Sequence, residues 1–477
     1  MEKQIDPRLT SAMHALAGGQ VEQAEFLCRS VLQERKRDDL AMALLAQVCN
    51  HLGKYDEAIE LIKNAIAKNG KRADYHGLLA DMLTVRGEFR AAIGAYDKAL
   101  KFQPNHPGVL AGKANTWLRL SEPEKAIALL SGAMKSGKED LTVATVYAKA
   151  LIASGKPEEA ASALLVHVPA EREPIETRRM LYFVLGKAME KAGEYQSAFE
   201  AYTQGNKLTR DSFDFEEWNA KLNDIKLAFP VGQVDATVAS SHTDGSRVFI
   251  VGMLRSGSTL TEQIIDAHPD GVGLGEIEVF PNILQHYCNE ESFSSFWKKI
   301  DQHTLDAIAQ EYLEATKSNA KIVTDKQLSN FQSVGAILSA LPNAKIIHCK
   351  RNPLSLGLSC FAQKFPPHTN AWANDLVDIG RYYNGYDTLM HHWKELFGNR
   401  ILDVQYETLV HHQEEETRRI LDFCELPFHD RCMRFWETRR TVLTLSQDQV
   451  NQPLYASAVD RHERFGELLA PLRNTLQ

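Results

Sequence analysis

Cysteine is scarce in this 477-residue chain, and its seven cysteines follow no pattern. Their number is odd, and no two of them form a Cys-x-x-Cys pair. A disulfide framework and a zinc site are therefore not expected, and small buried hydrophobic residues are the ordinary role of such cysteines. This usage fits a reducing compartment, so we expect a cytoplasmic protein.

The chain also lacks long apolar runs and a surplus of positive charge. No stretch of about 18 apolar residues occurs, so no transmembrane helix is expected. The first seven residues, Met-Glu-Lys-Gln-Ile-Asp-Pro, contain no apolar core of a signal peptide. Because the formal net charge is −8, we expect neither nucleic acid nor a membrane as a partner.

A turn residue followed five positions later by alanine recurs through the N-terminal half. Five copies end at intervals of 34 residues, at Ala24, Ala58, Ala92, Ala126 and Ala160, and one more ends at Ala198. This is the period of the tetratricopeptide repeat, a helical hairpin that buries its apolar face against its neighbours. We expect about six hairpins in an all-α superhelix over residues 1–210, with aromatic residues such as Tyr96 filling the gap to the next hairpin.

The repeat array suggests a partner only at the level of its fold. Such superhelices mostly bind a protein or peptide in their groove. The array could equally join two copies of the chain in a homodimer or cover the C-terminal domain.

Residues 211–244 are expected to form a connecting helix, at 214–229, and a small polar linker. From residue 245 to residue 477, short apolar segments alternate with helical ones, including helices expected at 259–267 and 375–397. The candidate strands are 247–251, 321–324, 345–349 and 401–405. This alternation predicts an α/β domain with a parallel sheet, and ligands bind such domains at the carboxyl ends of the strands.

The segment after the first candidate strand has the features of a phosphate-binding loop. Gly252 and Gly257 have the spacing of that loop, and Thr259 follows them. Backbone N–H groups at such a turn point at one spot and favour an anion there. Ser258 occupies the place of the lysine that reaches the β- and γ-phosphates of ATP, and the positive charge is found at Arg255 instead. The loop is therefore P-loop-like but argues against ATP, with an ATP-dependent kinase as the alternative.

A second motif, Arg351-Asn-Pro, follows the third candidate strand, and Ser359 lies eight residues after the arginine. Together with Gly252–Leu260, Asp266–Pro269 and Gly275-Glu276, it resembles sulfotransferases that use PAPS (3′-phosphoadenosine 5′-phosphosulfate), most closely the tyrosylprotein branch and its bacterial relatives. The resemblance covers nearly the whole chain. It implies a sulfotransferase fold, PAPS as co-substrate and no metal.

The resemblance also implies roles for individual residues in binding the nucleotide. The 5′-phosphate would be held by Arg255, Ser256, Gly257, Ser258 and Thr259. Arg351 and Ser359 would clamp the 3′-phosphate, since arginine offers a planar fork of donors. Tyr406 would line the nucleotide pocket, although a core tyrosine fits equally well. Ser446 and Arg461 would belong to a C-terminal loop that closes over the nucleotide, where Arg461 replaces a lysine of the family.

For the chemical step, the resemblance implies that Lys326, together with Arg255, neutralises charge that develops on the transferring sulfonate. Glu276 would be the base that deprotonates the acceptor. The stretch Gly-Glu-Ile-Glu departs from the family pattern, so Glu278 stays as the alternative base, and a scaffold without activity stays as an alternative function. A protein tyrosine, a sugar hydroxyl and a small phenol all fit as acceptor, and the array favours a protein or peptide.

Overall fold

The computed structural model describes residues 5–135, 140–209, 211–232, 238–289, 291–366, 368–437 and 459–477. The chain divides into two compact units, Met1–Ala201 and Tyr202–Gln477, and each is described here by itself.

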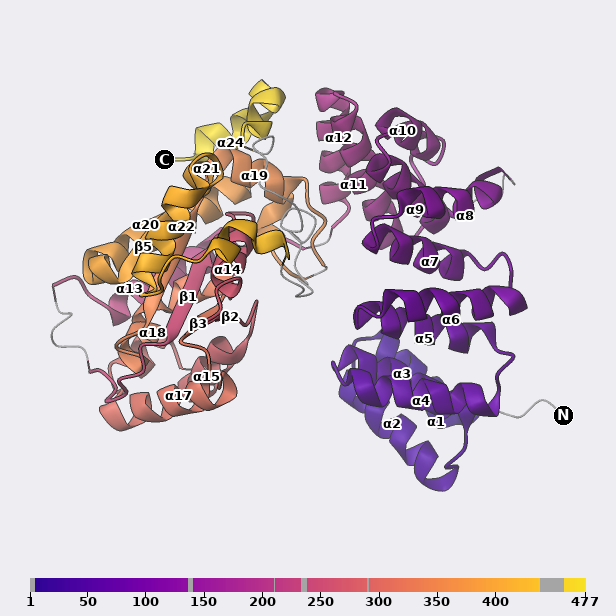
Figure 1. Cartoon of the computed structure of the whole chain (residues 1–477), viewed down its shortest axis with the longest axis horizontal. Coiled ribbons are helices and arrows are strands. Elements are labelled where there is room, and N and C mark those ends of the chain that lie inside the picture. Colours follow the sequence, from indigo (N-terminus) through magenta and orange to yellow (C-terminus); the bar gives the residue numbers. More distant parts are fainter. Residues whose placement is uncertain are drawn as a thin grey trace. The chain divides into compact units, whose positions relative to one another are not determined.

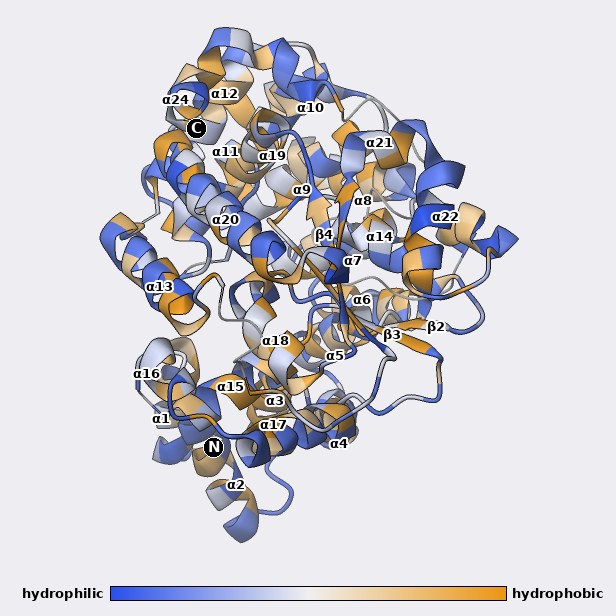
Figure 2. Cartoon of the chain, turned by 90° about the vertical axis from the view of Figure 1, so that its left-hand side faces the viewer, coloured by the Kyte–Doolittle hydropathy of each residue, from blue (hydrophilic) through white to orange (hydrophobic). Residues whose placement is uncertain are grey.

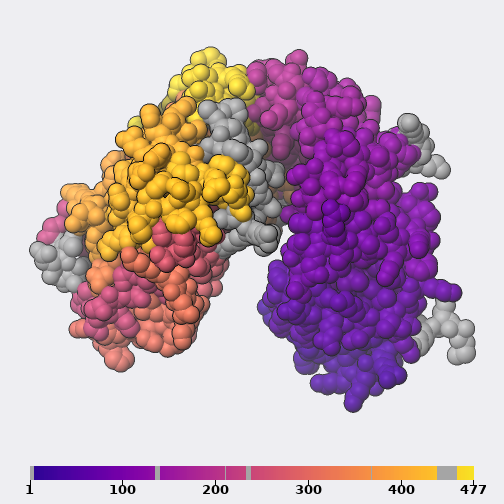
Figure 3. Space-filling model, viewed as in Figure 1, coloured from indigo at the N-terminus to yellow at the C-terminus, as the bar shows by residue number. Residues whose placement is uncertain are grey.

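Unit 1 is built from helical hairpins that follow one another along the chain (Figure 1). Its helices are α1 (Pro7–Ala17), α2 (Val21–Glu34), α3 (Asp39–His51), α4 (Tyr55–Lys68), α5 (Ala73–Val85), α6 (Phe89–Phe102), α7 (Pro107–Arg119), α8 (Pro123–Lys135), α9 (Leu141–Ala153), α10 (Pro157–Leu165), α11 (Ile175–Lys191) and α12 (Tyr195–Lys207), whose end belongs to unit 2. From α1 to α11, each helix contacts the next one along the chain, and the sequence colours change gradually along the surface of this unit (Figure 3).

The recurring motif marks the turn inside each hairpin and the point where its two helices cross. The turn residue has a left-handed backbone in every hairpin, which favours glycine, although Ser121 adopts it with a φ of 58°. All six alanines of the motif are completely buried, because a larger side chain there would hold the paired helices apart: Ala24, Ala58, Ala92, Ala126, Ala160 and Ala198. The predicted tetratricopeptide superhelix is confirmed.

Tyr96 illustrates how neighbouring hairpins fit together. Its side chain is 2% exposed, and its hydroxyl group donates to Asp81 of the same hairpin. A Cβ atom on Gly112, in the next hairpin, would lie 2.6 Å from the Tyr96 hydroxyl. The aromatic ring therefore fills the space to the next hairpin, as the sequence predicted, and the small residue opposite makes room for it.

Unit 2 alternates strands with helices. Its strands are β1 (Arg247–Gly252), β2 (Gly271–Gly273), β3 (Ile322–Asp325), β4 (Lys345–Lys350) and β5 (Ile401–Gln405). Its α-helices are α13 (Phe215–Ala228), α14 (Ser258–Asp266), α15 (Val279–Cys288), α16 (Phe293–Trp297), α17 (Gln302–Ala315), α18 (Val334–Ala340), α19 (Pro353–Phe361), α20 (Leu376–Phe397), α21 (Tyr406–His411), α22 (Gln413–Phe423) and α24 (Ala470–Thr475). Short 3₁₀ segments are η2 (Leu328–Ser333), η3 (Ala371–Asn374), η4 (Gly398–Arg400), η5 (Asp430–Glu437) and η7 (Arg461–Leu469).

The strands form one parallel sheet in the order β2-β3-β1-β4-β5. The parallel α/β domain is therefore confirmed, and the four expected strands are present within a residue at each end. Strand β2 was not predicted, because it has three residues, two of them glycine, and no apolar run marks it.

Helices cover both faces of the sheet, as parallel strands require. On one face, Val248 and Ile250 of β1 pack with the apolar residues of α14 and α22. On the other face, Phe249 packs edge-to-face against Phe280 of α15 and stacks on Tyr312 of α17. The strands are accordingly coloured as hydrophobic in Figure 2, whereas the helices are banded in hydrophobic and hydrophilic residues. Because β1 lies in the middle of the sheet, its carboxyl end is flanked by those of β3 and β4.

Candidate functional site

The loop between β1 and α14 is shaped by two close approaches of its backbone. A Cβ atom on Gly252 would lie 2.6 Å from the carbonyl oxygen of Cys349 on β4, so only glycine fits there. Arg255 and Gly257 both have left-handed backbones, with φ of 70° and 96°, on either side of Ser256. Gly257 is also the N-cap of α14 and offers no side chain to the first N–H groups of the helix. Both features direct backbone N–H groups toward an anion.

The hydroxyl group of Ser256 supports this interpretation. Ser256 is 1% exposed, and its Oγ atom has no hydrogen-bond partner among the described residues. A buried hydroxyl without a partner costs free energy, on the order of 1–3 kcal/mol, unless a ligand or water supplies one. Ser258 and Thr259, at the start of α14, are each 5% exposed.

Gly257 yields the first prediction, because both its backbone and its surroundings demand glycine. A Cβ atom there would lie 2.6 Å from Cδ2 of Tyr406. Gly257→Ala should lower the free energy of unfolding by about 1–3 kcal/mol, measured by urea denaturation. Gly398→Ala is the matched control, since a Cβ atom there meets nothing within 4 Å. Equal losses of stability in the two variants would contradict the proposed fit.

The arginines of the two phosphate motifs lie together at the carboxyl ends of β1 and β4. Nη1 of Arg351 donates to the carbonyl oxygen of Arg255 at 3.0 Å, and Nε of Arg255 donates to Oγ of Ser359 at 3.0 Å. The Arg351 guanidinium lies over the ring of Tyr406, 4.6 Å from its centre. The predicted 5′- and 3′-phosphate residues are thus linked to each other directly.

This cluster is electrostatically costly. Burial lowers the pKa of Arg255 and of Arg351, and Arg461 lowers the pKa of both further as a nearby positive charge. Glu407 acts in the opposite direction on Arg351 and also accepts from the backbone N–H of Asn352 at 2.9 Å. Arg351 on the backbone of Arg255, with the charge of Arg461 acting on both, makes a positive region suited to a ligand with more than one phosphate-like group.

Local sequence explains how Arg351 is presented. The side chain of Asn352 accepts from the N–H groups of Leu354 and Ser355 and so caps α19, which begins at Pro353. Proline is favoured at the first position of a helix, where no N–H group is needed. Arg351 is therefore fixed between the end of β4 and the start of a helix.

Helix α19 also holds the segment that carries Arg461. The hydroxyl of Ser355 donates to the carbonyl oxygen of Val459 at 2.8 Å and lies 2.7 Å from Nδ1 of His462. Arg461 begins η7 and is near enough to Arg255 and Arg351 for its charge to lower the pKa of both. Its place in a nucleotide site stays a prediction. Ser446, the other residue predicted in the C-terminal loop, lies outside the described residues.

Lys326 and Glu276 form an ion pair at the carboxyl end of β3. Nζ of Lys326 lies 2.6 Å from Oε1 of Glu276. The side chain of Lys326 is completely buried, whereas that of Glu276 is 43% exposed. A buried cation is therefore held by a carboxylate that is still accessible from solvent, which is a suitable arrangement for a base and a charge-neutralising group.

Glu278, the alternative base, and the histidine His268 are placed differently from Glu276. Glu278 accepts from the side chain of Gln327 and occupies the N-cap position of α15. His268 lies at the far end of α14, where Nε2 is 3.0 Å from the carbonyl oxygen of Pro427 and Nδ1 accepts from the N–H of Asp270. The described contacts place Glu276, and neither of these two, on Lys326.

Asp325, which precedes Lys326, is a buried acid. It is 1% exposed and accepts hydrogen bonds from the Tyr312 hydroxyl and the Gln327 N–H, both at 2.9 Å. Burial raises the pKa of Asp325 to about 7. The sequence neighbours Asp325 and Lys326 thus have different partners, since the ion pair of Lys326 is with Glu276.

Asp325 yields a prediction of pH dependence. Because the folded pKa is raised, the native protein holds a proton that the unfolded chain has released, so stability should fall as pH rises from about 4 to about 7. Asp325→Asn should remove this slope and be more stable than the wild type above pH 7. Urea denaturation between pH 5 and pH 8 measures how the free energy of unfolding depends on pH. Asp422→Asn, at an exposed aspartate, is the control. A slope that Asp325→Asn leaves unchanged would contradict the prediction.

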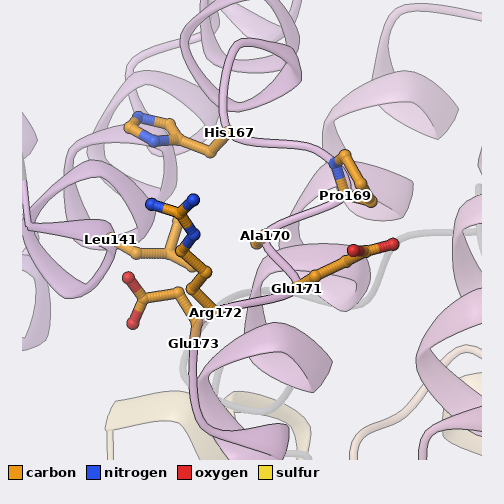
Figure 4. Close-up of a pocket in the computed structure, with 7 residues that line it drawn as sticks. All are labelled: Leu141, His167, Pro169, Ala170, Glu171, Arg172 and Glu173. Atoms are coloured by element: carbon orange, nitrogen blue, oxygen red, sulfur yellow. The ribbon is translucent and has the colours of Figure 1, made fainter.

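A pocket of about 330 Å³ lies in unit 1 and is lined by none of these residues (Figure 4). Its lining has side chains of both charges and no predicted site residue: Leu141, His167, Pro169, Ala170, Glu171, Arg172 and Glu173.

Within the described ranges, no helix combines the length and apolar character that crossing a bilayer demands. The same ranges contain no group of three or more His, Cys, Asp or Glu residues that could hold a metal ion.

Comparison with known proteins agrees with this division of the chain. Residues 247–430 match the model of the sulfotransferase family, and residues 15–82 match a model of the tetratricopeptide repeat. Residues 247–430 form a sulfotransferase-family domain. The match contains the loop after β1, the Lys326–Glu276 pair and Arg351.

Individual relatives match parts of this chain. An uncharacterised protein of Aquifex aeolicus is 34% identical over 64% of this chain and 42% of its own length. A protein-tyrosine sulfotransferase of Drosophila melanogaster is 25% identical over 45% of this chain and 46% of its own length. This chain thus spans less than half of these two relatives. The crystal structure of PilW, a type IV pilus biogenesis factor, matches 41% of this chain and 90% of its own with 18% identity and a TM-score of 0.36.

The sulfotransferase-family domain has features that fit PAPS. The loop after β1 provides converging N–H groups and the buried Ser256 hydroxyl for a 5′-phosphate, and the neighbouring Arg351 could hold a 3′-phosphate.

Sequence reasoning did not identify Glu262 of α14, which accepts from the N–H of Gly275 at 2.7 Å. A single glutamate inside an ordinary helix has no local signature, so only its partner in the fold reveals it.

Proposed function

We propose that this chain is a sulfotransferase that uses PAPS and transfers its sulfonate to a hydroxyl group. The observation that carries the proposal is the buried Lys326 paired with the accessible Glu276, 2.6 Å apart, beside the anion-binding loop and the arginine cluster. PAPS would supply the activated sulfonate. The sulfotransferase-family match and the protein-tyrosine sulfotransferases among the relatives support this reaction class.

Glu276 would take the proton from the acceptor hydroxyl. Its carboxylate is 43% exposed, so an acceptor can reach it, and its hydrogen bond to Lys326 fixes its orientation. Lys326 would place its positive charge where negative charge grows on the transferring group, and its burial strengthens that interaction by excluding water.

The nucleotide would be held by the loop and the arginine cluster. The N–H groups at the start of α14, with Ser256 and Thr259, would bind the 5′-phosphate. Arg351 would bind the 3′-phosphate, and Arg255 and Arg461 would share the remaining charge. Tyr406 would act through packing, since its ring contacts both Gly257 and Arg351.

For the acceptor, we propose a tyrosine in a protein or peptide. The support is the similarity to the protein-tyrosine sulfotransferase of Drosophila melanogaster, together with the repeat array, whose fold commonly binds proteins. The array would bring the acceptor or another protein partner to the domain. Sedimentation of the full chain, alone and with a tyrosine peptide, would show whether it is a homodimer and whether the peptide binds.

Calorimetric titration of the full chain with PAP (3′-phosphoadenosine 5′-phosphate, the nucleotide that PAPS becomes after transfer), AMP and magnesium-ATP tests the proposal. An assay of sulfonate transfer from PAPS to tyrosine, sugar and phenol acceptors follows. Metal-independent binding of PAP, much tighter than that of AMP, with transfer to tyrosine is the expected result. Preference for magnesium-ATP would indicate a kinase-like enzyme instead. PAP binding without transfer to any hydroxyl would favour a scaffold that has lost activity.

A further inference from the structure

A buried carboxylate lies between the phosphate loop and the Lys326–Glu276 pair. Glu262, on the second turn of α14, is 5% exposed. Its Oε1 atom accepts from the backbone N–H of Gly275 at 2.7 Å and lies 3.5 Å from the Thr324 hydroxyl. The same side chain thus reaches the loop after β2 and the end of β3.

In the loop after β2, hydrogen bonds hold both the N–H and the carbonyl group of Gly275. Gly275 has a left-handed backbone with φ of 79°, and its carbonyl oxygen accepts from the N–H of Lys326 at 3.0 Å. The N–H of Leu274 donates to the carbonyl oxygen of Thr324 at 2.8 Å. With Glu262 on the Gly275 N–H, both polar groups of this glycine are engaged, and the next residue is Glu276.

Burying a carboxyl group is costly, so its hydrogen bonds to the loop after β2 and to Thr324 must offset that cost. The hydrogen bond from the Gly275 N–H is 2.7 Å long, at the short end of the range for such bonds, and it holds the loop firmly. Neither Gly275 nor Glu276 belongs to a helix or strand, so the backbone that carries Glu276 depends on contacts of this kind.

We propose that Glu262 is a positioning residue that holds the Gly275–Glu276 backbone so that Glu276 meets Lys326. It would couple the helix of the phosphate loop to the loop of the base. The catalytic part of this inference rests on the proposed function, whereas the structural part does not depend on turnover.

Hydrogen–deuterium exchange of the full chain tests the structural part. The amide of Gly275 should exchange at least about 10-fold faster in Glu262→Ala than in the wild type, because its acceptor is lost. Glu262→Gln keeps an oxygen at that place and should retain protection. Gln263→Ala is the matched control, being the next residue of α14 and also 5% exposed. Equal exchange in Glu262→Ala and the wild type would overturn the proposal even if PAP proves not to bind.

Steady-state kinetics with PAPS tests the catalytic part. Glu262→Ala should lower kcat by roughly 10- to 100-fold, since misplacing a catalytic group by about 1 Å has effects of this size. PAP affinity should stay within about 3-fold, and Glu262→Gln should restore most of kcat. In a Glu276→Gln background, Glu262→Ala should cause no further loss, because the group that it positions no longer acts. A full additional loss in the double variant would reduce Glu262 to a general stabiliser of the fold and overturn the catalytic part.

Discussion

Glu276→Gln is expected to lower kcat by about 10²- to 10⁴-fold while PAP binds as before, because positioned general bases contribute rate factors of this size. The amide oxygen of glutamine can still accept the hydrogen bond from Lys326, so the local geometry should survive. What is lost is the ability to take a proton from the acceptor hydroxyl. Initial rates at saturating PAPS and acceptor, measured beside calorimetric PAP affinity, separate these two effects.

Glu278→Gln is the matched control for this prediction. It makes the same substitution two residues later, at the glutamate that the sequence left as the alternative base, and Glu278 contacts Gln327 instead of Lys326. It should retain nearly the full rate. If Glu278→Gln lowered kcat severely and Glu276→Gln only mildly, the base would be Glu278. That result would contradict the role that we infer for Glu276 from its ion pair with Lys326.

Arg351→Ala is expected to weaken PAP binding by roughly 10- to 100-fold, the equivalent of losing hydrogen bonds between charged partners. Arg351 is 7% exposed, so its guanidinium acts in a setting where water competes little. AMP, which lacks the 3′-phosphate, should lose much less affinity. The ratio of PAP to AMP affinity, measured by calorimetry, is therefore the quantity that reports on the proposed clamp.

Arg351→Lys sharpens the test, because lysine keeps the charge but not the planar fork of donors. Its PAP affinity should lie between those of the wild type and Arg351→Ala. Since Nη1 of Arg351 also holds the carbonyl oxygen of Arg255, a disturbed phosphate loop would weaken AMP as much as PAP. Equal losses for both nucleotides would show that Arg351 shapes the loop and does not read the 3′-phosphate.

The repeat array could be predicted from the sequence with few errors, because its structure is set locally. Each hairpin repeats the same small residue and the same left-handed turn, and each packs against its sequence neighbours. The alternation of strands and helices in unit 2 could be predicted equally well where the strands are apolar, as in β1 and β4. The prediction missed β2, because its three residues contain no apolar run and are held to β3 through backbone pairing.

The candidate site was predictable only in part. The spacing of Gly252 and Gly257 predicts an anion-binding turn, because the geometry of such a turn depends on adjacent residues. The choice between Glu276 and Glu278 could not be made in the same way, because it depends on which of them faces a lysine 50 residues further along the chain. Glu262 was missed for the same reason, as its partner Gly275 is placed by the addition of β2 to the sheet edge.

By itself, the sequence determined the two-part organisation and the glycine turn after β1, and it predicted the residue types that a sulfonate transfer needs. These depend on periodicity, on glycine at fixed offsets and on charge within a short segment, all of which are local properties of the chain. Tertiary structure alone decided that Arg351 contacts the backbone of Arg255, that Lys326 is buried on Glu276, and that Glu262 accepts a hydrogen bond from the loop that carries Glu276. The order β2-β3-β1-β4-β5 brings these distant segments to one edge of the sheet, and that order is fixed by packing over the whole domain.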